Sequence, residues 1–266
     1  MLTALYNAAS GMKAQELLID NTANNLANVN TTGFKRSRVD FADHMPNTLR
    51  QPGSAISNTQ VSPTGLQIGT GVRVVGTTKH FIQGSPEPTG NATDVAIEGD
   101  GFFQVQLPNG ETRYTRAGAF RLDGPSGNLV NADGYILTPQ ITIPSLTALS
   151  KLTIGVDGTV EVVQTGSDAT PQNLGQIQLA TFLNPAGLSS EGSNLFAATP
   201  ASGDAVVGNA GDTGFGTLRG GHLESSNVEV VTELISLISA QRAYEVNSRS
   251  IRAADEMLST ATDIVR

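Results

Sequence analysis

The sequence predicts an α+β protein. Two long terminal helices are expected to pair as a coiled coil, and the residues between them in sequence are expected to form an extended connecting arm and a mainly antiparallel β domain. Apolar residues recur at every seventh position near both ends, as they do along one face of a long helix. Between these ends, short alternating runs are separated by Asn-Gly and Asp-Gly pairs, which are typical of hairpin turns. The 266 residues include 29 glycines and no cysteine or tryptophan, which favours a turn-rich β structure without disulfides.

The segment from Leu2 to Gly33 is expected to form the N-terminal helix. It contains no proline and one internal glycine, Gly11. Asparagines weaken its last turns, and Gly33 is the expected stop. Its narrow heptad row predicts an interface between subunits, because pairing with one other helix covers only one side of the row. The row consists of Leu5, Met12, Ile19 and Leu26.

The C-terminal segment from His222 to Arg266 contains neither glycine nor proline. Ser226 followed by Glu229 has the spacing of a capping box, so we expect Ser226 to be the N-cap of a helix of about 38 residues. The neighbouring row, which begins at Leu234, is mostly polar. A second subunit interface is predicted on the apolar row of Val230, Leu237, Tyr244, Ile251, Leu258 and Val265.

The middle of the chain is expected to be a β domain. Phe103, Val105 and Leu107 alternate along one expected strand, and 159–163 and 176–183 are two more. Turns are predicted at Asn109-Gly110, Asp123-Gly124, Asp133-Gly134 and Asp157-Gly158. Residues 50–71 are rich in Ser, Thr, Gln, Pro and Gly, so they are expected to form an extended arm or long loop. The predicted domains are a helical domain (1–33 and 226–266), a connecting domain with the arm (34–75 and 213–225) and the central β domain (76–212).

Composition and motifs argue against several functions. The net charge of -8 argues against a nucleic-acid partner, and the small basic cluster of Lys35, Arg36 and Arg38 is interpreted as solvated charges or salt bridges to a neighbouring chain. The three histidines lie far apart, and dinucleotide and P-loop spacings are missing, so we predict no metal, no cofactor and no catalytic residue. We also expect no membrane span and no cleaved signal peptide, because no run of 18 apolar residues and no basic n-region is present.

Motifs along the whole chain resemble those of bacterial flagellar rod and hook proteins. Residues 23–35 and Ser10-Gly11-Met12 resemble the N-terminal motif of that family, and residues 225–228 and 241–247 resemble its C-terminal motif. Residues 95–103 and 114–120 are similar to its β core. The motif residues that we single out are Asn24, Asn25, Asn28, Gly33, Phe34, Asn227, Gln241, Arg242 and Tyr244.

Within the family, the chain is most similar to the distal-rod branch, because its length fits that branch and because residues 63–72 resemble a signature of that branch. A proximal rod protein of similar length and a hook-type axial protein are the alternatives. Residues 200–216 are rich in Gly, Ala and Asp and depart from the motifs of the family.

The resemblance implies a structural subunit, not an enzyme, that assembles with itself into a stiff helical tube transmitting torque from motor to hook. It implies a basal-body location that crosses the periplasm, and export by the flagellar type III apparatus. Other implied partners are the proximal rod and hook proteins, the P and L rings and the rod cap. Two other classes remain open: a polysaccharide-cleaving enzyme, which needs a carboxylate pair in a cleft, and an adhesin or binding module with a coiled-coil stalk.

Overall fold

The computed structural model describes residues 2–53, 55–57, 60–61, 63–143, 152–163 and 171–264. The chain divides into two compact units, which we call the helical unit and the β unit. The helical unit comprises residues 1–27, 37–78 and 229–266, and the β unit comprises residues 28–36 and 79–228. The predicted combination of helices with a β-rich body is confirmed. The three-domain division remains a prediction.

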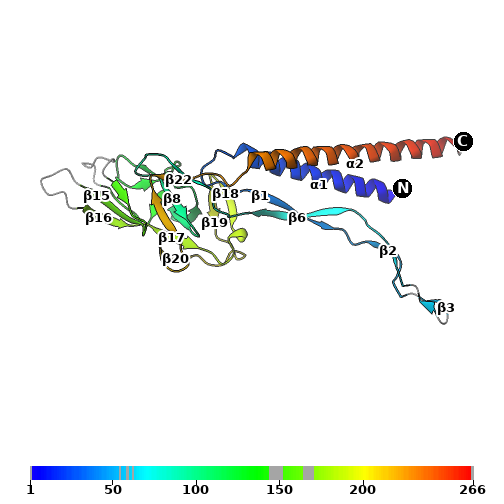
Figure 1. Ribbon diagram of the computed structural model, residues 1–266, viewed down its shortest axis with the longest axis horizontal. Helices are drawn as coiled ribbons and strands as arrows, with labels where there is room; N and C mark the ends of the chain where they lie inside the picture. The colour runs from blue at the N-terminus through cyan, green and yellow to red at the C-terminus, as the bar shows by residue number, and fades with distance from the viewer. Residues whose placement is uncertain are drawn as a thin grey trace. The chain divides into compact units, whose positions relative to one another are not determined.

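Two helices, α1 (Leu2–Ala27) and α2 (Val230–Ile264), pack side by side in the helical unit (Figure 1). A Cβ added to Gly11 would lie 2.9 Å from the Asn247 side-chain nitrogen, so the two helices approach closely there. No helix in the described part of the chain is long and apolar enough to span a membrane. The buried side chains of the two helices are small or polar: Ala8, Ala14, Thr22, Asn25, Glu233, Ala240 and Ala254.

Both predicted helix limits near the β unit are wrong. α1 ends at Ala27 instead of near Gly33, because the chain turns at Asn28, whose carbonyl oxygen accepts the Thr31 N–H at 3.1 Å. α2 begins at Val230 and has 35 residues. Ser226 is therefore not the N-cap; its hydroxyl accepts the Val228 N–H at 3.3 Å, in the extended segment before the helix.

The rest of the helical unit is a ribbon of paired strands (Figure 1). Residues 50–71, expected to be extended or a loop, lie mostly within this ribbon, and every residue of its β2 and β5 strands is exposed. The pairs are β1 (Ser37–Asp43) with β6 (Val72–Lys79), β2 (Asn47–Arg50) with β5 (Leu66–Ile68), and β3 (Ala55–Ser57) with β4 (Gln60–Val61).

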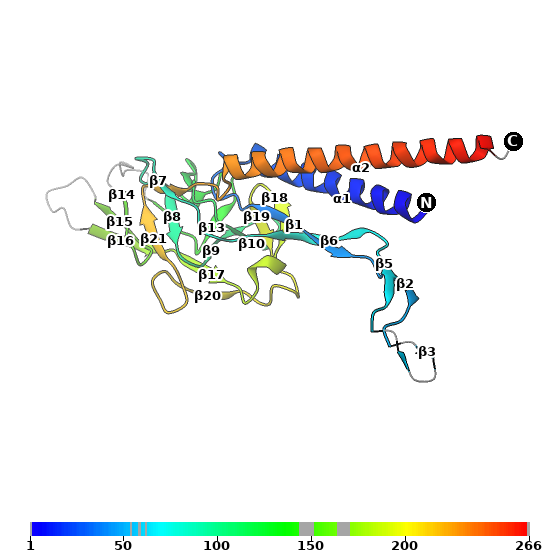
Figure 2. The same cartoon turned by 45° about the vertical axis from the view of Figure 1, so that its right-hand side comes forward.

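The β unit is built around a sheet whose strands pair in the order β11-β12-β13-β9-β10-β19-β18, with β17 joining β9 to β20 (Figure 2). The β unit as a whole, including its smaller sheets, contains the strands β7 (Pro86–Pro88), β8 (Val95–Glu98), β9 (Phe102–Gln106), β10 (Thr112–Thr115), β11 (Arg121–Leu122), β12 (Leu129–Val130), β13 (Ile136–Thr138), β14 (Leu152–Ile154), β15 (Thr159–Val163), β16 (Pro171–Gln176), β17 (Gln178–Thr181), β18 (Ser189–Gly192), β19 (Leu195–Ala197), β20 (Val206–Asn209), β21 (Thr217–Gly220) and β22 (His222–Glu224).

The register of this unit confirms the predicted turns and most of the predicted strands. All four turn dipeptides join antiparallel neighbours: β9 to β10, β11 to β12, β12 to β13, and β14 to β15. The expected strand 159–163 is β15, whereas the expected strand 176–183 covers the end of β16 and all of β17. Leu107 lies outside β9, because that strand ends at Gln106.

β9 is buried on both faces and therefore joins two apolar clusters. Phe103 and Val105 belong to the larger cluster, with side chains of the neighbouring strands. Phe102 points to a smaller, aromatic cluster, where its ring centroid lies 5.7 Å from that of Phe182. Alternation along a strand explains this division, because successive side chains point to opposite faces.

Gly118 marks a close approach of two backbone segments in the β unit. Its carbonyl oxygen accepts the Val95 N–H at 3.0 Å, and a Cβ added to Gly118 would overlap the Val95 carbonyl oxygen. We expect Gly118→Ala to lower the free energy of unfolding of the β unit by about 2 kcal/mol or more, as other overpacking changes do. Thermal unfolding followed by far-UV circular dichroism measures this loss.

Gly124→Ala is the matched control, because nothing lies within 4 Å of a Cβ built there. We expect its free energy of unfolding to stay within about 0.5 kcal/mol of the parent. Equal stability of the two variants would contradict the close approach at Gly118.

Candidate assembly interface

Asn25, at the end of α1, holds three segments of the helical unit together. Its side-chain nitrogen donates to the Ser37 carbonyl oxygen at 2.8 Å, and its side-chain oxygen accepts the Ser37 N–H at 2.9 Å. The same nitrogen lies 3.3 Å from a carboxylate oxygen of Glu233 on α2. An amide side chain offers both a donor and an acceptor, so Asn25 binds the start of β1 as a paired strand would.

The base of the ribbon is attached to α1 through Asn7 and Ser10. The Ser10 hydroxyl donates to the Asn7 carbonyl oxygen at 2.9 Å and accepts the Val72 N–H at 3.3 Å. The Asn7 side chain donates to the Gly69 carbonyl oxygen at 3.0 Å. Gly71 has φ +109°, and any Cβ there would overlap the Ser10 hydroxyl, so this position requires glycine. Ser10 belongs to the predicted N-terminal motif, whereas no sequence pattern pointed to Asn7.

Asn227 plays a role in the β unit like that of Asn25 in the helical unit. Its side-chain oxygen accepts the Arg36 N–H at 2.7 Å. Its side-chain nitrogen donates to the carbonyl oxygens of His80 and Ile82, at 2.8 and 3.0 Å. One amide therefore connects the segment that follows α1, the segment that follows β6 and the segment that precedes α2.

Lys35, Glu224 and Arg116 form a buried ionic cluster in the β unit. The Lys35 ammonium lies 2.5 Å from one carboxylate oxygen of Glu224, and an Arg116 guanidinium nitrogen lies 3.5 Å from the other. All three side chains are at most 2% exposed. Burial lowers the pKa of Lys35, and the charge of Glu224 opposes this shift. The interpretation of Lys35 as a solvated or interchain charge is therefore wrong, because its partner lies in the same unit.

Two further motif residues lie beside this cluster. The Gly33 N–H donates to the Glu224 carbonyl oxygen at 2.8 Å. Gly33 has φ +69°, and a Cβ there would lie 2.6 Å from the Ala117 backbone nitrogen. Phe34 is buried, with the Lys79 ammonium 5.0 Å from its ring centroid. The three consecutive residues Gly33, Phe34 and Lys35 are therefore all buried, from the glycine turn to the ion pair with Glu224.

The remaining motif residues are less buried. Asn24 is exposed, and Asn28 is half-buried and accepts a hydrogen bond from the Thr31 hydroxyl at 3.1 Å. Gln241 and Arg242 are exposed on α2, and Tyr244 is 41% exposed. Contacts within this chain therefore explain Asn25, Asn227 and Gly33 of the motifs, but they do not explain the Gln-Arg-x-Tyr run.

The predicted heptad rows do not coincide with the most buried positions of the helices. The N-terminal row of Leu5, Met12, Ile19 and Leu26 is half-buried throughout. In the C-terminal row, Leu237, Ile251 and Leu258 are half-buried, Val230 and Tyr244 are exposed, and Val265 lies outside the described residues. Their assignment to a subunit interface remains a prediction.

The exposed apolar side chains of α2 gather near its start. Val231 is 64% exposed, Ile235 is 63% and Ile238 is 49%. Sequence reasoning missed these three, although the apolar pairs at 230–231, 234–235 and 237–238 recur at helical spacing. We define the α2 apolar surface as Val230, Val231, Leu234, Ile235 and Ile238.

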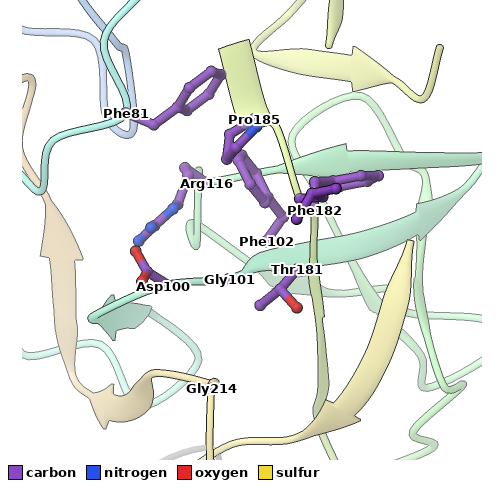
Figure 3. Close-up of a pocket in the computed structure, with 10 residues that line it drawn as sticks. Phe81, Asp100, Gly101, Phe102, Arg116, Thr181, Phe182, Pro185 and Gly214 are labelled. Carbon is purple, nitrogen blue, oxygen red and sulfur yellow. The ribbon is translucent and has the colours of Figure 1, made fainter. Parts of the chain in front are cut away.

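A pocket in the β unit is lined by aromatic rings and charged groups (Figure 3). The Arg116 guanidinium carbon lies 5.4 Å from the centroid of the Phe102 ring, and Figure 3 shows the side chain pointing toward Asp100. Burial lowers the pKa of Arg116, while the charges of Glu224 and Asp100 raise it. Arginine does not give up its proton in proteins, so Arg116 offers the pocket a fixed charge and no acid–base catalyst.

The ionic cluster gives a direct test of what stabilises the β unit. We expect Lys35→Met to lower the free energy of unfolding of the β unit by about 3 to 5 kcal/mol, because it removes one partner of a buried ion pair. Chemical unfolding at neutral pH measures this loss.

Arg113→Met is the control, because Arg113 pairs with Glu191 and Glu111 near the surface, at 2.6 and 2.7 Å. We expect it to cost no more than about 1 kcal/mol. If Lys35→Met costs as little as Arg113→Met, the buried cluster does not stabilise the fold.

Three family models match separate stretches of the chain. The family described as flagella basal body rod protein matches residues 5–35, and the flagellar basal body rod FlgEFG protein C-terminal family matches residues 219–264. The flagellar hook protein FlgE/F/G D1 domain matches residues 96–162. These ranges include both helices and the centre of the β unit.

Full-length relatives agree with this assignment. The chain is 44% identical to the flagellar basal-body rod protein FlgG of Borreliella burgdorferi, over 100% of both chains. It is 45% identical to that of Caulobacter vibrioides, over 99% of both chains, and 40% identical to that of Bacillus subtilis, over 100% of both. Similarity to the flagellar hook protein FlgE of Helicobacter mustelae, at 44% identity, covers only 52% of this chain and 30% of that protein. The chain therefore belongs to the family of flagellar basal-body rod proteins, and within it to the FlgG type.

Proposed function

We propose that this chain is a non-enzymatic subunit of the distal rod, which polymerises into a stiff helical tube and transmits torque from the motor to the hook. The α2 apolar surface is the observation that carries the proposal. Five apolar side chains on adjacent turns remain 40% or more exposed after α1 has packed on α2. Contiguous exposed apolar side chains of this kind mark a surface that another protein covers. Other copies of the chain supply that cover in a polymer.

The two helices would form the inner layer of the tube as a coiled coil. The buried apolar residues of α2 are small ones such as Ala240 and Ala254. The larger side chains of the predicted rows, half-buried in one copy, become fully buried when neighbouring copies pack beside them. Because closely packed side chains resist shear, such a layer would be stiff.

The ribbon would act as a strut between copies. Its β2 and β5 strands are entirely exposed, and a two-stranded ribbon is marginally stable in water on its own. Contact with neighbours would order it and stiffen the tube.

The other expected partners belong to the same proposal. They are the proximal rod and hook proteins, the P and L rings, the rod cap and the type III export apparatus. In this proposal the tube crosses the periplasm and carries the export channel.

The α2 apolar surface yields a direct test of polymerisation. We expect Ile235→Asp to raise the protein concentration needed for polymerisation at least about tenfold, because burying an unpaired charge costs more than 1.4 kcal/mol. Sedimentation measures the polymer, and electron microscopy shows whether it consists of tubes of one diameter.

Arg252→Asp is the control, since Arg252 is exposed on the same helix and its guanidinium donates to the Ser248 hydroxyl at 3.4 Å. It should polymerise within about twofold of the parent concentration. If the parent protein forms isolated particles only, the adhesin alternative gains support, and cleavage of purified peptidoglycan would support the enzyme alternative. Normal polymerisation of Ile235→Asp would remove the α2 apolar surface from the interface.

A further inference from the structure

Strand β20 of the β unit has an exposed side-chain patch at its start. Val206 is 60% exposed and pairs with Thr181 of β17. Leu183 and Asp204 each lie two residues beyond this pair, and Leu183 is 96% exposed. A Cβ on Gly203 would touch Leu183 at 3.9 Å, so the two segments remain neighbours there. We define Leu183, Val206 and Asp204 as the edge patch.

Among the strands that the structure describes, β20 pairs only with β17. Figures 1 and 2 show β20 at the margin of the β unit. An edge strand with exposed apolar side chains is a surface that attracts another chain. Residues 206–209 lie within the Gly-, Ala- and Asp-rich segment 200–216, which the family motifs leave without a role.

The ribbon of the helical unit carries a face of matching composition. In the β2–β5 pair, Arg50 is opposite Leu66 and Asn47 is opposite Ile68. Leu66 and Ile68 are two residues apart on one strand, so their side chains share a face with Arg50. Leu66 is 51% exposed and Ile68 is 43% exposed. We define Arg50, Leu66 and Ile68 as the ribbon face.

Each of these two surfaces lies in a stretch of sequence whose charged residues have one sign. Between His44 and Gly71 the only Lys, Arg, Asp or Glu is Arg50. Between Lys151 and Arg219 the sequence has acidic residues and no lysine or arginine. These acids are Asp157, Glu161, Asp168, Glu191, Asp204 and Asp212.

We propose that the ribbon face of one copy packs on the edge patch of a second copy. Leu66 and Ile68 cover Leu183 and Val206, and the Arg50 guanidinium pairs with the Asp204 carboxylate. This inference rests on the proposed polymerisation and names the partner surface of the strut. Arg50 can reach a second copy, because it is exposed and its guanidinium donates a long hydrogen bond, 3.4 Å, to the Thr64 carbonyl oxygen at the surface.

The contact has a geometric consequence for assembly. The ribbon face and the edge patch are different surfaces, so the contact between copies is heterologous. Heterologous contacts that do not close into a ring produce open helical polymers. The same contact therefore repeats along the polymer, and each copy donates one ribbon and accepts another.

The test is a charge reversal on each side of the contact in the full chain. We expect Arg50→Glu and Asp204→Arg each to raise the concentration needed for polymerisation about fivefold or more, because each places like charges together. The double variant Arg50→Glu/Asp204→Arg restores the opposite pair and should polymerise within about twofold of the parent. An equimolar mixture of the two single variants should also regain polymerisation, because each variant can pair with the other.

Arg121→Glu and Asp133→Arg are the matched controls, since both residues are exposed elsewhere in the β unit. They should leave polymerisation within about twofold of the parent. A double reversal that polymerises no better than either single variant would overturn the contact, as would single variants that behave like these controls.

Cysteine cross-linking identifies the partner copy directly, because the chain contains no native cysteine. With Ile68→Cys/Val206→Cys and a mild oxidant, we expect covalent multimers from polymerised protein, and none with either cysteine alone. Cross-linked monomers, or polymers without cross-links, would overturn this inference and leave the proposed function standing. A parent protein that never polymerises would overturn both.

Discussion

The buried carboxylate of Glu224 is the group on which the connection between the two ends of the chain depends. All three residues of its cluster belong to the β unit: Glu224 comes shortly before the C-terminal helix in sequence, Lys35 follows the N-terminal helix, and Arg116 lies in the middle of the chain. One buried charge therefore binds three segments distant in sequence, and the Gly84 N–H donates to the same carboxylate at 2.9 Å. A buried carboxylate is tolerable only when such partners surround it. This requirement holds the three segments together within the β unit.

Asparagine side chains extend the same principle to uncharged positions. Asn25 and Asn227 each donate to and accept from backbone groups of other segments. Segments that leave a sheet or helix carry backbone groups that need partners, and an amide supplies both kinds at once. The two residues thus fix the direction in which the chain enters and leaves each helix. Directional control of this kind matters in a family whose members stack in a regular array.

Local patterns in the sequence predicted what depends on local physics. Glycine turns, the antiparallel hairpins that they join and the two long helices follow from spacing along the chain, and the structure confirms them. The helix limits were wrong because other local contacts replace the expected caps: the Asn28 carbonyl oxygen accepts the Thr31 N–H after α1, and the Ser226 hydroxyl accepts the Val228 N–H before α2 starts at Val230. The burial of Lys35 was also unpredictable, since its partner is 189 residues away in sequence. A heptad count identifies apolar rows, but it cannot show which row meets α1 and which remains exposed.

The distribution of side-chain size on the helices explains why this chain is suited to assembly. The most buried side chains of α1 and α2 are alanine, threonine, asparagine and glutamate, and the larger apolar residues of the predicted rows are at most half-buried. Large apolar residues, by contrast, occupy exposed positions near the start of α2. A monomer evolved to be stable alone would place these residues the other way round, because burial of large side chains supplies most of the favourable free energy of folding. The exposed side chains near the start of α2 therefore contribute little to the stability of a single copy, and the proposed polymer would bury them.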